Sequence, residues 1–173
     1  MKKLFILLGV ILGVSTVSAQ KFARVNLQEI VVAMPEFDQA QKNLEAFGKD
    51  LQEQMEQIQV EFNNKLADFQ KNQGTMAASV KQMRQQELEQ LQQRFAEFQQ
   101  IAQQDFQKKE SELLEPVQKK ANEAVNKVAK SAGYLAVFNT AVPSLAYFDE
   151  AQLTDISALV KKELGITETP AAK

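Results

Sequence analysis

The sequence predicts an α+β protein that is mostly α-helical, with a small β body and a long antiparallel α-helical hairpin arm. Two observations predict this class. Apolar residues recur every eleven positions through the middle of the chain, and apolar residues that alternate with a period of two are confined to its two ends. Eleven residues over three turns give about 3.67 residues per turn, which keeps each series on one face of a nearly straight helix. The strands of the body must therefore come from both chain ends.

Residues 1–19 are expected to form a cleavable signal peptide. A basic start at Lys2 and Lys3 precedes an apolar run over residues 4–14, which is too short to span a bilayer comfortably. Small residues at 17–19 suit a cleavage site. We therefore expect export of the chain, with an uncleaved membrane anchor as the alternative interpretation.

The first part of the body is predicted over residues 20–35. Alternation over residues 21–27 predicts a short strand. Asn26 then suits the N-cap of a short helix, and Glu29 stands three residues later, as in a capping box. Pro35 ends this piece and fits the first turn of the next helix.

The hairpin arm is predicted over residues 36–131, with its tip near residues 72–76, where Asn, Gln, Gly and Thr interrupt the periodicity. We expect the residues of the eleven-residue series to form the seam between its two helices. The first helix carries Leu44, Phe47, Leu51, Met55, Ile58, Phe62, Leu66 and Phe69, and the second carries Leu91, Phe95, Ala102, Phe106, Leu113, Val117, Ala124 and Val128.

Two residues interrupt the arm and are hinge candidates. Gly48 weakens the first helix by about 1 kcal/mol relative to alanine. Pro116 has no N–H group, and its ring clashes with the carbonyl of the residue four positions earlier, so a kink is expected.

The second part of the body is predicted over residues 132–165. Residues 134–139 and 145–148 are expected to be strands, and residues 153–164 return to helical spacing. Residues 166–173 are expected to be a flexible tail. Three short strands and two small helices offer little core for one subunit, which favours an oligomer whose bodies share a core.

The composition gives little support for catalysis or for a bound cofactor. The chain has no cysteine and no histidine, so the commonest metal ligands and general base are missing, and we expect neither a metal nor a cofactor. Neighbouring carboxylates on the arm stand two positions apart, where they do not face each other on a helix. The formal net charge of −2 argues against a nucleic-acid-binding protein. An enzyme is therefore not expected.

The remaining candidate for function is the surface of the arm. Apolar residues beside the seam series are candidates for binding a partner polypeptide, because an exposed apolar strip is either a binding site or an aggregation liability. They are Val60, Ala67, Met76, Val80, Met83, Phe98, Ile101 and Leu114. A group of four basic residues near the tip, Lys65, Lys71, Lys81 and Arg84, gives residues 65–84 a net charge of +3, suited either to acidic cargo and anionic membrane surfaces or simply to solubility.

The layout resembles the Skp/OmpH-like family of periplasmic chaperones. Three segments carry the resemblance: KFARVNLQEIV at residues 21–31, GYLAVFNTAVPSLAYF at 133–148 and LTDISALVKKEL at 153–164. Between them lie the long Gln- and charge-rich helices, which many coiled coils would match.

The resemblance implies a jellyfish-like homotrimer in the periplasm. The strands of three subunits would build a small β-barrel, and the arms would surround a cavity that holds unfolded outer-membrane proteins without ATP. Val25, Leu27, Leu135, Val137, Leu145 and Tyr147 would then build the body and trimer core.

The chain departs from the best-known member of this family, which is strongly basic, whereas this one is acidic. We therefore expect cargo capture to depend mainly on apolar contact. The basic tip is a candidate for transient contact with a membrane surface. The alternative function is a structural coiled-coil spacer or adaptor of the cell envelope.

Overall fold

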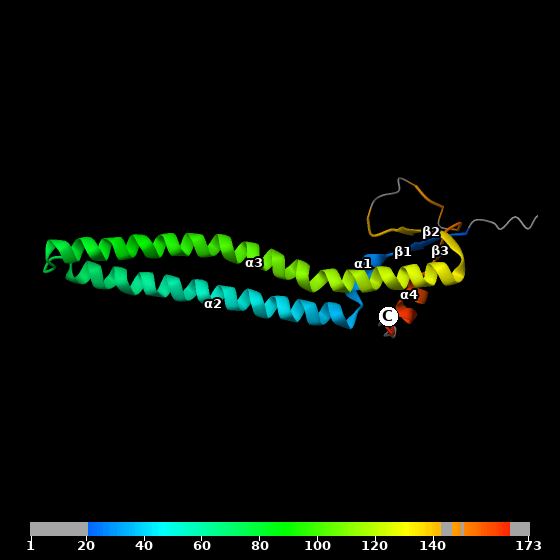
Figure 1. Ribbon diagram of the computed structural model, residues 1–173, viewed down its shortest axis with the longest axis horizontal. Coiled ribbons are helices and arrows are strands. Elements are labelled where there is room, and N and C mark those ends of the chain that lie inside the picture. Colours follow the sequence, from blue (N-terminus) through cyan, green and yellow to red (C-terminus); the bar gives the residue numbers. More distant parts are fainter. Residues whose placement is uncertain (1–20, 143–146, 150, 167–173) are drawn as a thin grey trace, which may run out of the picture.

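The computed structural model describes residues 21–142, 147–149 and 151–166, so the expected signal peptide lies outside the described residues. The elements follow in the order β1 (Lys21–Val25), α1 (Leu27–Val32), α2 (Pro35–Asn72), α3 (Ala78–Ala132), β2 (Tyr134–Asn139), β3 (Thr154–Asp155) and α4 (Ser157–Glu163). Figure 1 shows a long arm made of α2 and α3, with every other described element gathered at one end of it.

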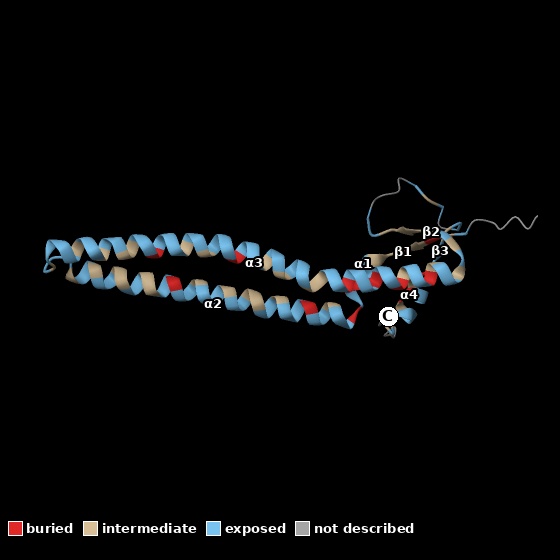
Figure 2. Cartoon of the chain, in the orientation of Figure 1, coloured by how far each residue is buried: buried red, intermediate tan, exposed pale blue. Residues whose placement is uncertain are grey.

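The arm consists of two helices that lie side by side. Helix α2 has 38 residues and α3 has 55, which correspond to about 57 and 80 Å at 1.5 Å per residue. The chain turns back at residues 73–77, and α3 returns along α2 to the body (Figure 1). The residues of the eleven-residue series from Leu44 to Phe69 and from Leu91 to Leu113 are buried or half-buried, as expected of a seam between α2 and α3. Val117, Ala124 and Val128 of the same series are buried in the body instead. The outer surfaces of both helices are almost entirely exposed (Figure 2).

Pro116 lies inside α3, and the helix continues through it. Figure 1 shows that α3 bends on its way from the tip to the body, in the stretch where its colour turns from green to yellow. A proline-induced kink explains a bend in this region, because Pro116 cannot donate a hydrogen bond to the preceding turn.

The sheet contains three parallel strands in the order β2-β1-β3, with β1 in the middle. Residue 23 of β1 pairs with residue 137 of β2 and residue 154 of β3, so both ends of the chain meet in this sheet. Ala23 and Val25 point into the core, while Phe22 lies on the other face with its ring centroid 6.2 Å from that of Phe138.

The third strand is not where the sequence predicts it. Residues 145 and 146 of the predicted strand lie outside the described residues, and Tyr147 and Phe148 are irregular. The strand is instead Thr154–Asp155, and the predicted helix over 153–164 begins only at Ser157. The backbone N–H of Ile156 donates to the carbonyl of Arg24 (3.0 Å), and Asp155 Oδ1 accepts from the N–H of Ser157 (2.9 Å). The first bond and the strand pairing hold residues 154–156 against β1, and the second is a local bond at the start of α4, so the helix begins only after this segment.

The body has its own core, and the last part of α3 belongs to it. Its buried residues are Ala23, Val25, Ile30, Val31, Met34, Val117, Ala121, Ala124, Val128, Ile156 and Val160. The core therefore extends along α3 as far as Val117, although the sequence assigned residues up to 131 to the arm. Ile166, the first residue of the predicted flexible tail, also packs against this core, and the rest of that prediction lies outside the described residues.

The first helix of the body is capped as predicted. Asn26 Oδ1 accepts from the backbone N–H of Glu29 (3.2 Å), and Asn26 Nδ2 donates to Glu29 Oε1 (2.6 Å). The cap ends β1 at Val25, so Leu27 begins α1 and does not extend the strand.

Candidate functional site

The predicted cargo-binding residues lie on the arm with different degrees of exposure. Val60 and Ile101 expose 56% and 52% of their surface, and Val80 and Met83 are also exposed. Ala67 is exposed too, whereas Met76, Phe98 and Leu114 are half-buried. The five exposed residues are therefore available to a partner on this subunit, and the other three also contribute to packing.

Ion pairs between the helices mark how α2 and α3 are aligned. Arg94 of α3 contacts Glu61 of α2 at 2.8 Å, and Lys120 contacts Glu36 near the body. Exposed ion pairs contribute little stability, about 0–1 kcal/mol each. They nevertheless show which levels of the two helices face each other.

The positive charge of the basic tip is partly neutralised by neighbouring carboxylates. Glu87 lies next to two of its four cations: Arg84 at 2.8 Å and Lys65 at 3.5 Å. Extending the tip to residues 65–89 adds Glu87 and Glu89 and lowers its net charge to +1. Lys71 and Lys81 have no ion pair among the described residues.

Below the tip, the arm is strongly acidic. We call residues 36–64 of α2 and 90–118 of α3 the shaft; the first stretch has a net charge of −5 and the second −2. Several shaft cations are already paired with neighbouring carboxylates, including Lys49 with Glu53 and Lys108 with Glu112. The shaft therefore presents an excess of carboxylates to solvent.

Gly48 has a close neighbour across the seam. A Cβ atom on Gly48 would lie 3.2 Å from Cε2 of Phe106, a tight contact that the missing side chain avoids. Next to this contact, an open groove of about 940 Å³ lies between the helices. Its lining is free of charged residues and comprises Gly48, Leu51, Gln52, Met55, Ala96, Gln99, Gln100, Ala102, Gln103 and Phe106. We call it the glycine groove.

An open surface of α2 is formed by Glu53, Glu56, Gln57, Val60, Glu61 and Asn64. These positions fall on one side of the helix because they are spaced three or four residues apart. We call it the acidic face. It places the exposed Val60 among three carboxylates.

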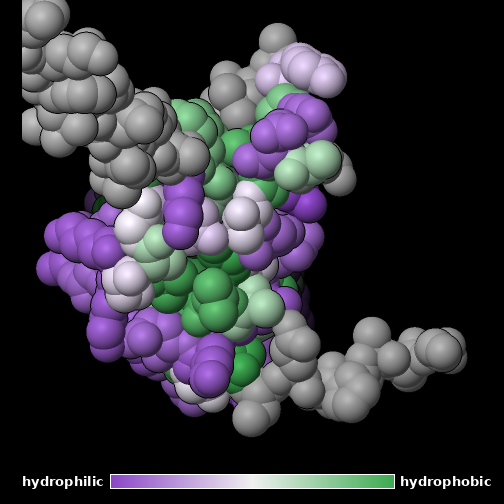
Figure 3. Space-filling view, turned by 90° about the vertical axis from the view of Figure 1, so that its right-hand side faces the viewer, coloured by the Kyte–Doolittle hydropathy of each residue, from purple (hydrophilic) through white to green (hydrophobic). Residues whose placement is uncertain are grey.

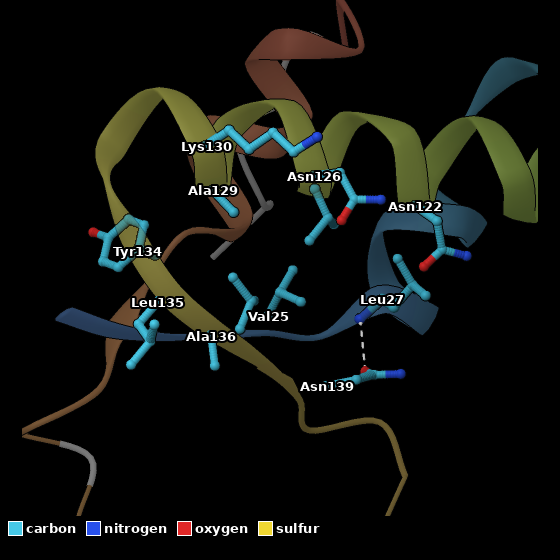
Figure 4. Close-up of a pocket in the computed structure, with 12 residues that line it drawn as sticks. Val25, Leu27, Asn122, Asn126, Ala129, Lys130, Tyr134, Leu135, Ala136 and Asn139 are labelled. Atoms are coloured by element: carbon cyan, nitrogen blue, oxygen red, sulfur yellow. Dashed lines mark hydrogen bonds between the residues drawn. The ribbon is translucent and has the colours of Figure 1, made fainter. Parts of the chain in front are cut away.

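The body offers a groove of about 450 Å³ between β2 and the last turns of α3 (Figure 4). Asn122, Asn126, Ala129 and Lys130 of α3 line one side of it, and strand residues line the other. The backbone N–H of Leu27 donates to Asn139 Oδ1 (3.2 Å) at its floor. Sequence reasoning did not identify the polar α3 residues, because on a helix they look like an ordinary solvated face.

The predicted trimer-core residues divide into two groups. Val25 is buried in the core of its own subunit, and Leu27 and Val137 pack against that core. Leu135 and Tyr147 expose 63% and 84% of their surface, and Leu145 lies outside the described residues. Figure 3 shows hydrophobic residues gathered at the centre of this end of the molecule, with hydrophilic residues around them.

Two ion-paired carboxylates of the arm have shifted pKa values. A hydrogen bond from Lys120 lowers the pKa of Glu36, and a hydrogen bond from Arg84 lowers the pKa of Glu87. Both groups are mainly solvated, so solvent screens these interactions. The shifts mark contacts between or along the helices and do not indicate an acid–base pair for catalysis.

Residues 21–142, 147–149 and 151–166 contain no group of three or more acidic, histidine or cysteine residues that could hold a metal ion. None of the helices in these residues is long and apolar enough to cross a bilayer.

Long helices that project from a small β body, with apolar residues exposed along them, define the class of helical-arm proteins to which this fold belongs. The OmpH-like outer membrane protein family matches residues 21–164, and the chain belongs to this family. The resemblance found in the sequence is thereby confirmed.

One relative and one solved structure are similar to this chain. The chain is 27% identical to the chaperone protein Skp of Yersinia enterocolitica over 158 residues, which cover 91% of this chain and 94% of the relative. Its fold matches the crystal structure of a putative outer membrane chaperone (OmpH-like) from Caulobacter crescentus CB15 with a TM-score of 0.72. That match covers 84% of this chain and 83% of the other at 12% identity, which shows the fold alone.

Proposed function

We propose that this protein is an ATP-independent holdase chaperone of the periplasm, which binds unfolded outer-membrane proteins between its helical arms and prevents their aggregation. The observation that carries the proposal is the exposure of apolar residues along the arm of a chain that belongs to the OmpH-like family. No nucleotide, metal or catalytic group takes part in this function.

The arm suits a holdase for a physical reason. An unfolded chain presents apolar side chains at irregular intervals, so many weak contacts hold it better than one specific pocket. Val60, Val80, Met83 and Ile101 are spread along the two helices and supply such contacts. Methionine adapts its shape to different partners because its side chain is flexible. Binding of the unfolded cargo lowers its free concentration and therefore slows its aggregation.

The proposal includes a homotrimer in which the bodies of three subunits share a core. Leu135 and Tyr147 are exposed on one subunit, and the sheet carries Phe22 and Phe138 on the face turned away from the core. Burial of these apolar residues between subunits would stabilise the assembly and place the arms around a common cavity.

A solubility assay tests the holdase function. A denatured outer-membrane β-barrel protein is diluted out of urea with near-stoichiometric amounts of the purified protein, and light scattering is followed. The holdase suppresses aggregation without ATP. A structural spacer or adaptor, which is the alternative function, leaves the scattering unchanged, and that result would overturn the proposal.

Native mass spectrometry tests the assembly. The protein alone is expected at the mass of three subunits, and the addition of unfolded cargo is expected to give that mass plus one cargo chain. A monomer at micromolar concentration would contradict the trimer.

A further inference from the structure

We infer that an unfolded cargo chain docks along one flank of the arm, as an extended segment without charged residues. This inference rests on the proposed function and names the face of the arm that performs it. A flank is one of the two sides of the hairpin along which the surfaces of α2 and α3 meet. The two flanks differ in chemistry, and this difference decides which of them the cargo occupies.

One flank carries two hollows that follow each other along the seam. The first is the glycine groove, and the second, of about 190 Å³, is lined by Ile58, Gln59, Phe62, Leu91, Gln92 and Phe95. Gln52 of the groove and Gln59 of the second hollow are seven residues apart on α2. Gln99 and Gln92 are likewise seven apart on α3. Residues at this spacing lie on the same side of a helix, so both hollows open on one flank, which we call the glutamine flank.

The opposite flank is occupied by charged side chains, and we call it the charged flank. At the level of Leu91, a hollow of about 260 Å³ on this side is lined by Glu61, Lys65, Glu87, Gln90, Leu91 and Arg94. Gln90 stands two positions from Gln92, and positions two apart lie on different sides of a helix. The ion pairs of Glu61 and Glu87 join the two helices across this flank. A cargo segment that docked here would have to displace them.

The glutamine flank suits an extended polypeptide without charge. Apolar side chains of the cargo leave water when they enter hollows lined by residues such as Leu51, Met55 and Phe95. Glutamine amides both donate and accept hydrogen bonds, so the glutamines of the two hollows can pair with the peptide groups of the cargo. Neither hollow has a charged residue in its lining, so no carboxylate or ammonium group there loses its hydration when cargo covers it.

The two hollows together accommodate a large part of a β-barrel strand. From Gly48 to Phe62 the helix rises by about 21 Å, which an extended chain covers with about six residues. Transmembrane strands of β-barrel proteins are about ten residues long and alternate apolar with polar side chains. Such a strand can place its apolar side chains in the hollows and keep its polar side chains toward solvent. The occupant is therefore an uncharged stretch of an unfolded β-barrel strand.

Photo-cross-linking tests which flank touches the cargo. The photoreactive residue benzoylphenylalanine replaces Gln52 or Gln92 on the glutamine flank, or, as matched controls two residues away on each helix, Gln54 or Gln90. All four glutamines are exposed. The purified protein is mixed with a denatured outer-membrane β-barrel protein diluted from urea and is then irradiated. Because only groups in direct contact react, we expect the cross-link yield at the first two positions to exceed that at the controls by at least about threefold.

Two results of this experiment would overturn the docking site. The first is an equal yield on both flanks, or a higher yield at the controls. The second is a cross-link from Gln52 and Gln92 to a second copy of this protein in place of cargo, because the glutamine flank would then be a contact between subunits.

A pair of charge variants measures how much the flank contributes to binding. Gln52→Glu with Gln92→Glu places two carboxylates beside the hollows, whereas Gln54→Glu with Gln90→Glu adds the same charge on the other side of each helix. Affinity for the labelled, denatured β-barrel protein is measured by fluorescence anisotropy. We expect the first variant to bind about fivefold more weakly, because cargo must then bury carboxylates, and the second to bind within about twofold of the native protein. Equal losses in both variants would contradict the assignment to the glutamine flank.

Failure of this inference is distinguishable from failure of the proposed function. If the protein keeps the β-barrel protein soluble but the glutamine flank gives no preferential cross-link, the docking site is wrong and the holdase function stands. If no position cross-links to cargo and the β-barrel protein still aggregates, the proposed function fails and the inference fails with it.

Discussion

At the scale of single residues, Gly48 acquires a role that its position in the sequence did not indicate. The sequence made it a hinge candidate because glycine weakens a helix. The structure gives a packing reason for the same residue, since Phe106 from α3 fills the place beside it. Whether it also acts as a hinge remains a prediction.

Replacement of this glycine by alanine measures the packing contribution. Gly48→Ala should gain about 1 kcal/mol of helix stability, but the new methyl group must displace the Phe106 ring by a few tenths of an ångström. We therefore expect the free energy of unfolding, measured with urea, to rise by clearly less than about 1 kcal/mol. In a Phe106→Leu background the full gain should appear. A full gain already in the native background would show that the contact is unimportant.

Glu36 makes the stability of the folded protein depend on pH. Its pKa is lowered by the hydrogen bond from Lys120, so the charged form is favoured in the folded state. The stabilisation is therefore fully present above the ordinary carboxyl pKa of 4.5 and is lost as the pH falls through the lowered pKa.

Unfolding measured across this pH range tests the sign. The difference in unfolding free energy between the native protein and Glu36→Gln should be small and constant at neutral pH, and should disappear in acid. Glu110→Gln, which removes an exposed carboxylate without a described ion pair, should show no such dependence. A difference that grows in acid would contradict the argument.

At the scale of elements, the sequence predicts the helices well and the sheet only in part. The bounds of α2 and α3 follow from periodicity, Pro35 and the break near Gly74, because each signal is local. The strand Tyr134–Asn139 was also predicted from its own residues. The strand at Thr154–Asp155 was not, since two polar residues carry no periodic signal and are held only by β1.

The site was less predictable than the fold. Exposed apolar residues such as Val60 and Ile101 were predicted because they stand beside the seam series. The glycine groove and the ion pairs of Glu87 depend on the alignment of α2 with α3, which the sequence of either helix does not contain.

Replacement of Pro116 tests whether this residue bends α3. Pro116→Ala restores an N–H group to α3 and should straighten and stiffen the arm, because alanine is favoured over proline by about 3 kcal/mol in a helix interior. Small-angle scattering should show a narrower distribution of arm spread. Ser111→Ala, at an exposed position five residues earlier, serves as the control. An unchanged spread would exclude Pro116 as a hinge.

At the scale of the whole molecule, charge and apolar surface have separate tasks. In the proposed function, apolar contacts spread along the arm supply most of the affinity for cargo. Without residues 1–19 the chain has a net charge of only −4, so long-range attraction of a charged partner is expected to be weak.

We therefore expect salt to affect cargo binding only modestly. Between low and physiological ionic strength, where the Debye length falls to about 8 Å, we expect the affinity for an unfolded β-barrel protein to fall by less than about tenfold. Binding titrations at several salt concentrations measure this. A steep loss would show that electrostatic attraction, and not apolar contact, holds the cargo.

The central position of β1 has a consequence for how the molecule is made. Lys21 leaves the ribosome early, but its partner Tyr134 follows only after the whole arm has been synthesised. The helices need only local contacts, so they can form first, whereas the sheet must wait for distant segments. The helices of the arm can therefore fold before the sheet of the body, although β1 precedes them in the chain. Until β2 and β3 have been synthesised, Ala23 and Val25 have no core against which to pack. The newly made protein is then itself an incompletely folded chain with exposed apolar residues.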